Sequence, residues 1–469
     1  MALRMTCALF GLALFWAFAP GIANSDTIDM IAQGIARNIN TWHSPATSLF
    51  AGFAAPLGMP NGFLVLQVAL AAVCVVYLCA WVGKALSTQD LALSIVLAIV
   101  TVYTSLLIVL ASAYAIKDMW IALLLTAAGM LLYSGAALPA TIAAVSLCAI
   151  AVLIRPVSIL AIAPFILAAA MASTRGFTKA TGAAILVLVS IAALPSIFNA
   201  AADAKIDSPT TPLFVFDIVG IGMQMPAPAQ FVSERTGLSL TNEQLKKCHS
   251  SSSARPLIWG DCAAYRPPLK AEICIWGYCP ATPSPTTDTW LRTISQHPLE
   301  YFKHRLAYYH EFMERVDIER NGWVARPMFQ EHASNSPKRI GELTLPPEVK
   351  ISFTGEGDNP ILNALISVHR FLSSIGLGSP YGWTIVSLIA IAVAWTADRN
   401  LFSVAFLSVT AIAASSIANT ITFMLLSAHA GPRYLCWSLV GRALAMTLAL
   451  LSLARKRAAL RVASPLSIA

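Results

Sequence analysis

The chain has 469 residues, of which 57% are hydrophobic and only 12% are charged, and its formal net charge is +8. So little polar surface cannot cover a water-soluble globule of this length, which excludes a soluble enzyme and predicts a membrane protein. The cations do not gather on one water-exposed stretch, which argues against nucleic acid as a partner.

Ten apolar runs follow one another along the chain, each near the length of about 20 residues that a helix needs to cross a bilayer. Only helices satisfy their own backbone hydrogen bonds within such a run, and no alternating β-barrel pattern is present. The sequence therefore predicts an all-α polytopic membrane protein with about ten transmembrane helices. They cover approximately 5–20, 62–83, 91–115, 119–134, 137–153, 156–173, 180–201, 380–396, 401–428 and 435–454.

The first run has two interpretations. Arg4, the short hydrophobic stretch and the small residues Gly21-Ile22-Ala23 fit a cleavable signal peptide as well as an uncleaved anchor. We favour the anchor on the length limits of spanning helices. In either case the segment that follows lies outside the cytoplasm.

Lys and Arg residues in short loops set the predicted orientation, because they resist translocation. Counted over ten helices, they fall on one side: Arg4, Lys84, Arg175, Lys179, Arg399, Arg455, Lys456, Arg457 and Arg461. We assign that side to the cytoplasm, so both termini of this inner (plasma) membrane protein are predicted to lie inside. The first outer loop is then 21–61. The predicted domains are an N-terminal transmembrane module (1–201), an extracytoplasmic segment (202–379) and a C-terminal transmembrane module (380–469).

The outer segment 202–379 divides into three parts. Its first half is rich in Pro and Ser, as at Ser250–Ser253 and Pro280–Pro285, which predicts irregular structure with little core of its own. The next part predicts a helix over about 287–316, with an apolar stripe that packs on the membrane domain: Trp290, Ile294, Tyr301 and Leu306. Residues 361–377 predict an interfacial helix, because a crossing there would put the C-terminal basic cluster outside.

The nine cysteines divide by their surroundings. Five are predicted to be inert packed thiols in or beside apolar runs: Cys7, Cys74, Cys79, Cys148 and Cys436. An even number in an oxidising compartment predicts two disulfides, with three possible connectivities, among the outer four: Cys248, Cys262, Cys274 and Cys279. A zinc site with His249 as an extra ligand is the alternative, but the tight CxxC spacing of zinc ribbons is absent.

Ionisable residues beside apolar helix ends are costly unless they have a function or a partner. In the predicted topology four such groups share the outer face: Asp26 and Asp29 with Trp42-His43-Ser44-Pro45, Lys117-Asp118, Arg155-Pro156, and Gly431-Pro432-Arg433-Tyr434. A carboxylate there could deprotonate an acceptor hydroxyl while cations neutralise a leaving phosphate. The grouping predicts transfer from a lipid phosphate or pyrophosphate, with the phosphate bound by Lys117, Arg155 and Arg433.

Each group also has a structural interpretation. Helix capping, interfacial anchoring, a local Lys117-Asp118 ion pair and contact with lipid headgroups explain the residues one group at a time. They do not explain why four groups share one face. On the outer helix we read His297, His304 and Arg305 as structural. The sequence contains no defined metal-ligand spacing. A divalent cation is therefore left as a cofactor alternative, and no residue is assigned as its ligand.

Seven short motifs occur in an order known from one class of membrane enzymes: Ser25-Asp26, Ala32-Gln33, Trp42-His43-Ser44-Pro45, Lys117-Asp118, Ile154-Arg155, His297-Pro298-Leu299-Glu300-Tyr301 and His304-Arg305-Leu306. They resemble bacterial polytopic proteins of the GT-C glycosyltransferase class. The similarity is to a largely uncharacterised branch with a D…DWHPP first loop, a KD pair and an HP..Y..HRL helix. The resemblance covers most of the chain.

The resemblance implies an inverting transfer of a sugar from a polyprenyl-phosphate donor, on the outer face, to an envelope glycan, lipid or protein. It assigns the catalytic base to Asp26, with Asp29 as the substitute, and donor-phosphate binding to Lys117, Arg155 and Arg433. Substrate contacts fall on Trp42, His43, Asp118 and Tyr434. The chain departs from the family pattern at three places: Thr41 replaces an Asp, Ser44 replaces a Pro, and Pro156-Val157 lack the usual Asn.

Two other classes of function stay open. A transporter or lipid-glycan flippase predicts charged residues in mid-helix, and the ten predicted spans show almost none. A non-enzymatic envelope assembly protein would use the disulfide-held outer segment to bind a partner.

Overall fold

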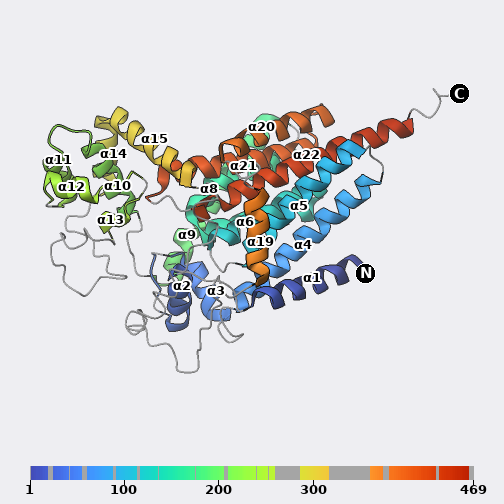
Figure 1. Cartoon of the computed structure of the whole chain (residues 1–469), viewed down its shortest axis with the longest axis horizontal. Helices are drawn as coiled ribbons and strands as arrows, with labels where there is room; N and C mark the ends of the chain where they lie inside the picture. Colours follow the sequence, from blue (N-terminus) through green and yellow to red (C-terminus); the bar gives the residue numbers. More distant parts are fainter. Residues whose placement is uncertain are drawn as a thin grey trace. The chain divides into compact units, whose positions relative to one another are not determined.

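The computed structural model describes residues 2–19, 25–37, 39–41, 43–54, 61–87, 91–113, 117–135, 137–174, 176–204, 210–238, 240–251, 253–258, 286–315, 360–372, 380–428 and 432–463. The regular elements in these ranges are helices, without a strand, which confirms the all-α prediction (Figure 1). They group into two compact units, and we describe each by itself.

The first unit comprises Met1–Lys205, Asn321–Thr420 and Arg433–Ala469. It contains the predicted N-terminal transmembrane module and, apart from residues 421–432, the predicted C-terminal one. Its helices in chain order are α1 (Ala2–Phe18), α2 (Ser25–Ala36), α3 (Pro45–Ala54), α4 (Asn61–Leu86), α5 (Leu91–Ala113), α6 (Lys117–Ser134), α7 (Leu138–Ile154), η2 (Pro156–Ser158), α8 (Ile159–Ser173), α9 (Phe177–Ala201), α19 (Pro360–Leu372), α20 (Pro380–Ala397), most of α21 (Val404–Leu426), η7 (Pro432–Leu435) and α22 (Cys436–Ala463).

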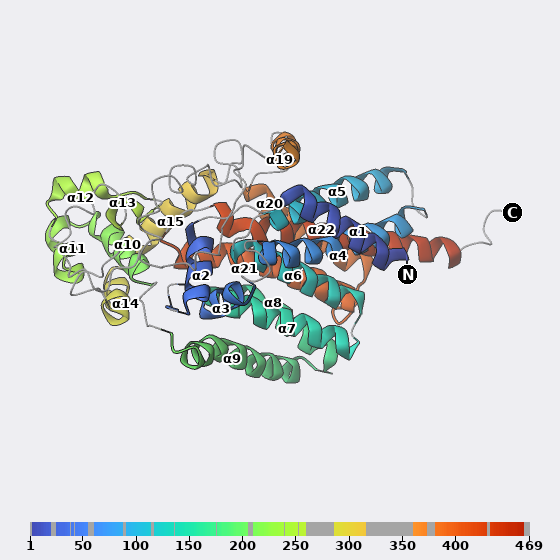
Figure 2. The same cartoon turned by 90° about the horizontal axis from the view of Figure 1, so that it is seen from below.

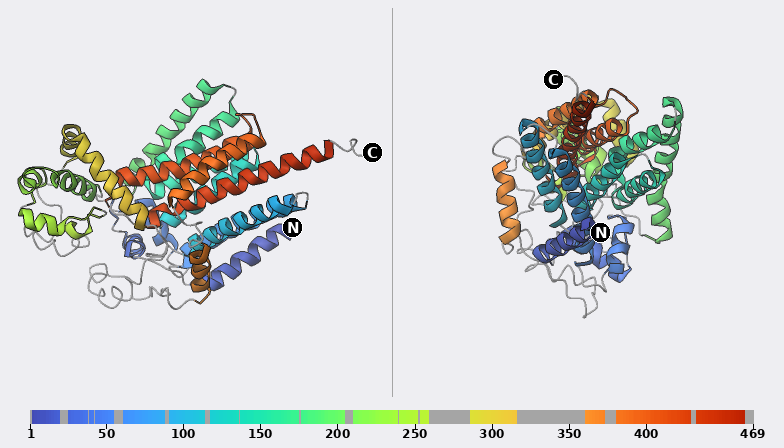
Figure 3. Two further views of the ribbon diagram at one scale, coloured as in Figure 1. Left: turned by 45° about the horizontal axis from the view of Figure 1, so that its top comes forward. Right: turned by 90° about the vertical axis from the view of Figure 1, so that its right-hand side faces the viewer.

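Helices α6 and α22 form the centre of this unit. Helix α22, the long red ribbon of Figure 3, packs against α4, α5, α6 and α20. Helix α6 is buried along almost its whole length. Helix α9, by contrast, lies at the edge of this unit, packed against α7, α8 and α3 (Figure 2). It exposes large apolar side chains such as Leu186 and Val189. Such an apolar outer face is typical of a helix that borders lipid.

All ten predicted apolar runs are helical, and six helices are long and apolar enough to cross a membrane: Leu64–Leu86, Leu91–Ala113, Pro156–Ser173, Phe177–Ala201, Val404–Leu426 and Cys436–Arg461. The chain is therefore membrane-embedded. Three further predicted runs are shorter apolar helices: Ala2–Phe18, Leu138–Ile154 and Thr384–Ala397. The tenth, α6, begins with two charged residues, and the count of ten spans and their orientation stay predictions.

The second unit comprises Ile206–Arg320 and Ile421–Pro432. Its helices are α10 (Thr211–Gly222), α11 (Pro228–Thr236), α12 (Asn242–Cys248), α13 (Arg255–Ile258), α14 (Thr287–Gln296) and α15 (Pro298–Arg315). Every residue of α10 is buried, and α11, α14 and α15 pack against it. For the described residues, the predicted irregular first half with little core is therefore wrong: the apolar run of α10 supplies a core, which the Pro- and Ser-rich surroundings concealed.

The helix predicted over 287–316 is two helices, because Pro298 lacks a backbone N–H and disfavours helical geometry at His297. The single apolar stripe is also wrong. The Trp290 ring stacks on Phe214 of α10, while Leu306 is exposed. The predicted interfacial segment 361–377 begins as α19, which packs on α1 and α5, and residues 373–377 lie outside the described part.

The cysteines of the apolar helices are free thiols: Cys7, Cys74, Cys79, Cys148 and Cys436. Cys248 is buried at the end of α12. Cys262, Cys274 and Cys279 lie outside the described residues, so the predicted two disulfides and their connectivity stay predictions.

Candidate functional site

Two of the predicted groups meet where α6 begins and α7 ends. The two helices pack on each other, so Lys117 and Asp118, at the start of α6, lie beside Arg155, which directly follows α7. Asp118 is buried, and its carboxylate forms an ion pair with the Arg155 guanidinium. A buried carboxylate needs such a partner, because an uncompensated charge away from water is costly.

The first outer loop reaches the same place. The Lys117 ammonium lies 3.1 Å from Nδ1 of His43, which is buried. An ammonium can only donate, so Nδ1 accepts and the imidazole is the Nε2–H tautomer. The next residue, Ser44, donates its hydroxyl to the carbonyl oxygen of Leu153 in the last turn of α7. His43 and Ser44 therefore attach this loop to both helix ends.

A third segment supplies an aromatic ring. Tyr434 lies in η7, and the Arg155 guanidinium carbon lies 4.6 Å from the centre of its ring. Asn419 of α21 donates its amide N–H to the Tyr434 carbonyl oxygen at 3.1 Å. The guanidinium is thus held by a carboxylate at its edge and a ring on its face, a combination that fixes the direction of its N–H donors.

The loop that carries His43 is positioned by α2 and α3. A Cβ added to Gly34 would lie 1.8 Å from the Ser48 carbonyl oxygen, and one added to Gly52 would lie 2.2 Å from the Gly34 carbonyl oxygen, so the two helices meet backbone to backbone. The side-chain oxygen of Gln33 accepts a hydrogen bond of 3.2 Å from the backbone N–H of Asn40, which fixes the turn between the helices.

The α2–α3 pair in turn packs on α6. Ile31 of α2, Ala51 of α3 and Trp120 of α6 share one apolar cluster, and the Phe50 ring meets the Trp120 ring edge to face. Asp26 and Asp29 therefore lie on a helix that packs beside Lys117. Their side chains, and that of Arg433, are outside the described part of the structure, as is Trp42.

Five predicted site residues thus come together in the first unit: His43, Lys117, Asp118, Arg155 and Tyr434. They come from four separate segments of the chain. Within the described residues, no group of three or more His, Cys, Asp or Glu side chains is arranged to hold a metal ion. The binding chemistry of this cluster is that of cations and an aromatic ring.

Sequence analysis missed a further charged residue in this unit, Arg442, which is buried in the second turn of the apolar helix α22. Its guanidinium donates to the Thr420 hydroxyl of α21 at 2.7 Å. The Ser438 hydroxyl accepts hydrogen bonds from the Thr420 hydroxyl and from the Asn419 amide N–H, each at 3.0 Å. A chain of hydrogen bonds therefore connects Arg442 with Asn419, whose amide N–H also donates to the Tyr434 carbonyl oxygen.

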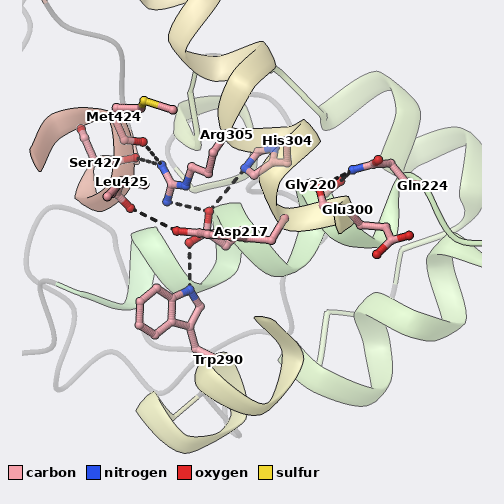
Figure 4. A network of polar contacts seen from close by, with 11 residues as sticks. Asp217, Gly220, Gln224, Trp290, Glu300, His304, Arg305, Met424, Leu425 and Ser427 are labelled. Atoms are coloured by element: carbon pink, nitrogen blue, oxygen red, sulfur yellow. Dashed lines mark hydrogen bonds and ion pairs between the residues drawn. The ribbon is translucent and has the colours of Figure 1, made fainter. Parts of the chain in front are cut away.

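The second unit contains a separate network around Asp217 of α10 (Figure 4). Its carboxylate receives the indole N–H of Trp290 at 2.8 Å and pairs with the Arg305 guanidinium at 2.6 Å and His304 Nε2 at 3.4 Å. Burial lowers the pKa of His304 even though the Asp217 carboxylate acts in the opposite direction. His304 is therefore neutral at neutral pH, and Asp217 and Arg305 form the charged pair.

Arg305 also closes the end of another helix. Its NH1 group donates to the carbonyl oxygens of Met424, at 3.3 Å, and Ser427, at 2.7 Å, at the C-terminal end of α21 (Figure 4). Gly220 makes room for the neighbouring ring, because a Cβ there would lie 2.1 Å from His304 Nδ1. The structural interpretation of His304 and Arg305 fits this geometry, but Asp217, their common partner, was not predicted.

The signal for Asp217 was present in the sequence: it is a lone carboxylate within the apolar run Leu213–Gly222. The signal for Arg442 was a lone cation within the last apolar run. Comparison of the chain with protein-family models, with curated proteins and with solved structures finds no match.

Proposed function

We propose that this chain is a membrane glycosyltransferase that moves a sugar from a polyprenyl-phosphate-linked donor to an envelope glycan, lipid or protein on the extracytoplasmic face. The observation that carries the proposal is the meeting of Lys117 and Arg155 at two helix ends, with His43 and Tyr434 beside them. Two fixed cations at the ends of apolar helices suit a phosphate group on a lipid tail.

The charges of the cluster favour an anionic ligand. Lys117 and Arg155 carry two positive charges, and Asp118 supplies one negative charge. Asp118 therefore orients the guanidinium without neutralising the site. Cations held in place before the reaction stabilise charge that develops on a leaving phosphate, because no reorganisation is needed at that moment.

In the proposed reaction, Arg155 binds the donor phosphate through its forked N–H groups and Lys117 contributes a point charge. A carboxylate takes the proton of the acceptor hydroxyl, whose oxygen attacks the anomeric carbon, and the bond from that carbon to the phosphate oxygen breaks with inversion. Asp26 is the proposed base and Asp29 its substitute. The packing of Ile31 against Trp120 supports this role, because it keeps α2 beside α6.

Sidedness is part of the proposal. The cluster is proposed to open away from the cytoplasm of a bacterial inner membrane, with both termini inside. Disulfides among Cys248, Cys262, Cys274 and Cys279 belong to the same proposal, since they need an oxidising compartment. Reporter fusions within 21–61 and next to Arg433 should both read the outer compartment, and opposite readings would remove the mechanism.

A transporter or lipid-glycan flippase is the second candidate, and Arg442 is the observation that favours it. A buried cation within a candidate span is typical of a pathway through the membrane. The glycosyltransferase stays the first choice because Arg442 is joined by Thr420, Ser438 and Asn419 to Tyr434, which relates it to the cation cluster.

The test uses the purified full chain in lipid nanodiscs with a labelled polyprenyl-phosphate sugar and a mixture of envelope acceptors. We expect label to reach an acceptor with the wild type and transfer to be lost in Asp26→Asn, at unchanged thermal stability. Donor turnover that survives in the Asp26→Asn/Asp29→Asn double variant would contradict the proposed base. Donor movement across the membrane without turnover would favour the flippase.

A further inference from the structure

Helix α15 has two faces of different character. Its buried face carries His304, Arg305 and Tyr308, which lie in or beside the Asp217 network. Its opposite face carries Leu299, Phe302 and Leu306, which are 57%, 56% and 48% exposed. The spacing of these three residues, three and then four positions apart, places them on one side of the helix. Such a row of large apolar side chains needs a covering partner.

The attachment of α15 indicates what covers this row. Arg305 donates to the carbonyl oxygens of Met424 and Ser427, and the Tyr301 hydroxyl donates to the Leu425 carbonyl oxygen at 3.5 Å. These acceptors lie in the last turn of α21 or directly after it; α21 ends at Leu426 and is one of the six helices able to cross the membrane. Helix α15 is therefore bonded to the point where a candidate span ends.

The end of α21 is itself exposed and apolar within the same unit. Ile421, Leu425 and Leu426 all belong to the exposed large hydrophobic residues. In a membrane protein, apolar side chains at the end of a span lie next to lipid, and a helix bonded there lies at the level of the headgroups. The exposed Lys303, next to Phe302, suits this place, because a lysine can reach phosphate groups while its neighbours enter the apolar layer.

We propose that α15 is a membrane-surface helix whose exposed row, Leu299, Phe302 and Leu306, inserts into the outer part of the lipid layer. The occupant of this surface is the bilayer itself, and the inference does not depend on the glycosyl transfer proposed above. It also explains why the Asp217–Arg305 pair is buried at this place, since Arg305 holds α15 against the end of α21.

Photo-crosslinking tests this directly. The full chain is made with p-benzoylphenylalanine in place of Phe302 or Leu306 and reconstituted in nanodiscs of phosphatidylcholine and phosphatidylglycerol. Glu234 of α11 is the matched control, because its side chain is 57% exposed but lies on a helix with no described bond to the end of α21. Thermal unfolding of each variant is compared with that of the wild type, so that lipid contact is scored only in folded protein.

We expect lipid adducts, detected by mass spectrometry, at positions 302 and 306, several-fold above those at position 234. Adducts to a second copy of the chain at 302 and 306 would overturn the proposal in favour of an oligomer interface. Equal, low lipid labelling at all three positions would overturn it as well, because the row would then face water. Phe302→Asp and Leu306→Asp should weaken retention of α15 at the bilayer, seen as faster amide exchange in this helix in nanodiscs.

Discussion

The two polar clusters of the molecule use the same residue types for different ends. In the second unit, Arg305 is 1% exposed, and its guanidinium is engaged by Asp217 and by carbonyl groups at the end of α21. In the first unit, the Arg155 side chain is 16% exposed. Arg155 directly follows α7, and Lys117 begins α6, so both cations lie at helix ends. A fully buried, paired cation such as Arg305 stabilises the fold. A partly exposed cation such as Arg155 is able to exchange a protein partner for a ligand.

The largest effect is expected from Asp217→Asn. The substitution keeps the shape of the side chain but leaves the Arg305 charge buried without a carboxylate, which should cost about 3–5 kcal/mol in the free energy of unfolding of the second unit. Thermal and urea unfolding measure it, with the exposed pair member Asp288→Asn as the control. If Asp217→Asn unfolds like the wild type, the network does not hold the unit together.

Arg155→Gln sharpens the comparison from the other side. Removing a fixed cation from a developing phosphate charge should lower transfer about 10²- to 10³-fold. Stability should fall as well, because the buried Asp118 carboxylate loses its partner, so transfer is compared in folded protein only. Arg292→Gln, on a residue that is 73% exposed, is the control and should keep full activity. An Arg155 variant with normal turnover but lost stability would place this cluster in the same structural class as the Asp217 network.

Gly220→Ala tests how closely the second network is packed. The added Cβ meets the His304 ring, so His304 must move or α10 and α15 must separate, at a cost of about 1–3 kcal/mol. Gly182→Ala in α9 is the matched control, because a Cβ there meets nothing within 4 Å. Differential scanning calorimetry of both variants measures the difference, and equal melting temperatures would show that the contact is loose.

The smallest effect is a pH dependence of the second unit. Burial lowers the pKa of His304, and also that of His249, below the ordinary 6.5. The unfolded chain then binds protons that the folded chain does not. Stability is therefore constant above about pH 6.5 and falls as the pH drops below it.

The midpoint of urea unfolding between pH 8 and pH 5 measures this dependence, and His304→Gln should reduce its slope. Stabilisation on acidification would show instead that Asp217 holds His304 in its charged form.

Local patterns predicted the apolar helices of the first unit and five residues that meet in the candidate site. The expectation that charged residues at helix ends gather on one face brought His43, Lys117, Asp118, Arg155 and Tyr434 together before any geometry was known. Their pairing was not predictable, because it depends on how α6 and α7 pack: Asp118 pairs with Arg155, not with its neighbour in sequence.

Asp217 and Arg442 were missed for a related reason. Each is a single charge within an apolar run, and its partners come from distant parts of the chain: positions 290, 304 and 305 for Asp217, and position 420 for Arg442. A hydropathy pattern reports the cost of such a charge but not the residues that offset it. Only the tertiary arrangement identifies them.

Binding of a polyprenyl phosphate without its sugar tests the central claim most directly, because it depends on the cations alone. In nanodiscs, we expect saturable binding by the wild type and by Arg292→Gln, and binding weakened at least tenfold in both Lys117→Gln and Arg155→Gln, the loss of about 1.4 kcal/mol or more that a charge-assisted contact supplies. Equal affinity in all four proteins would contradict the account.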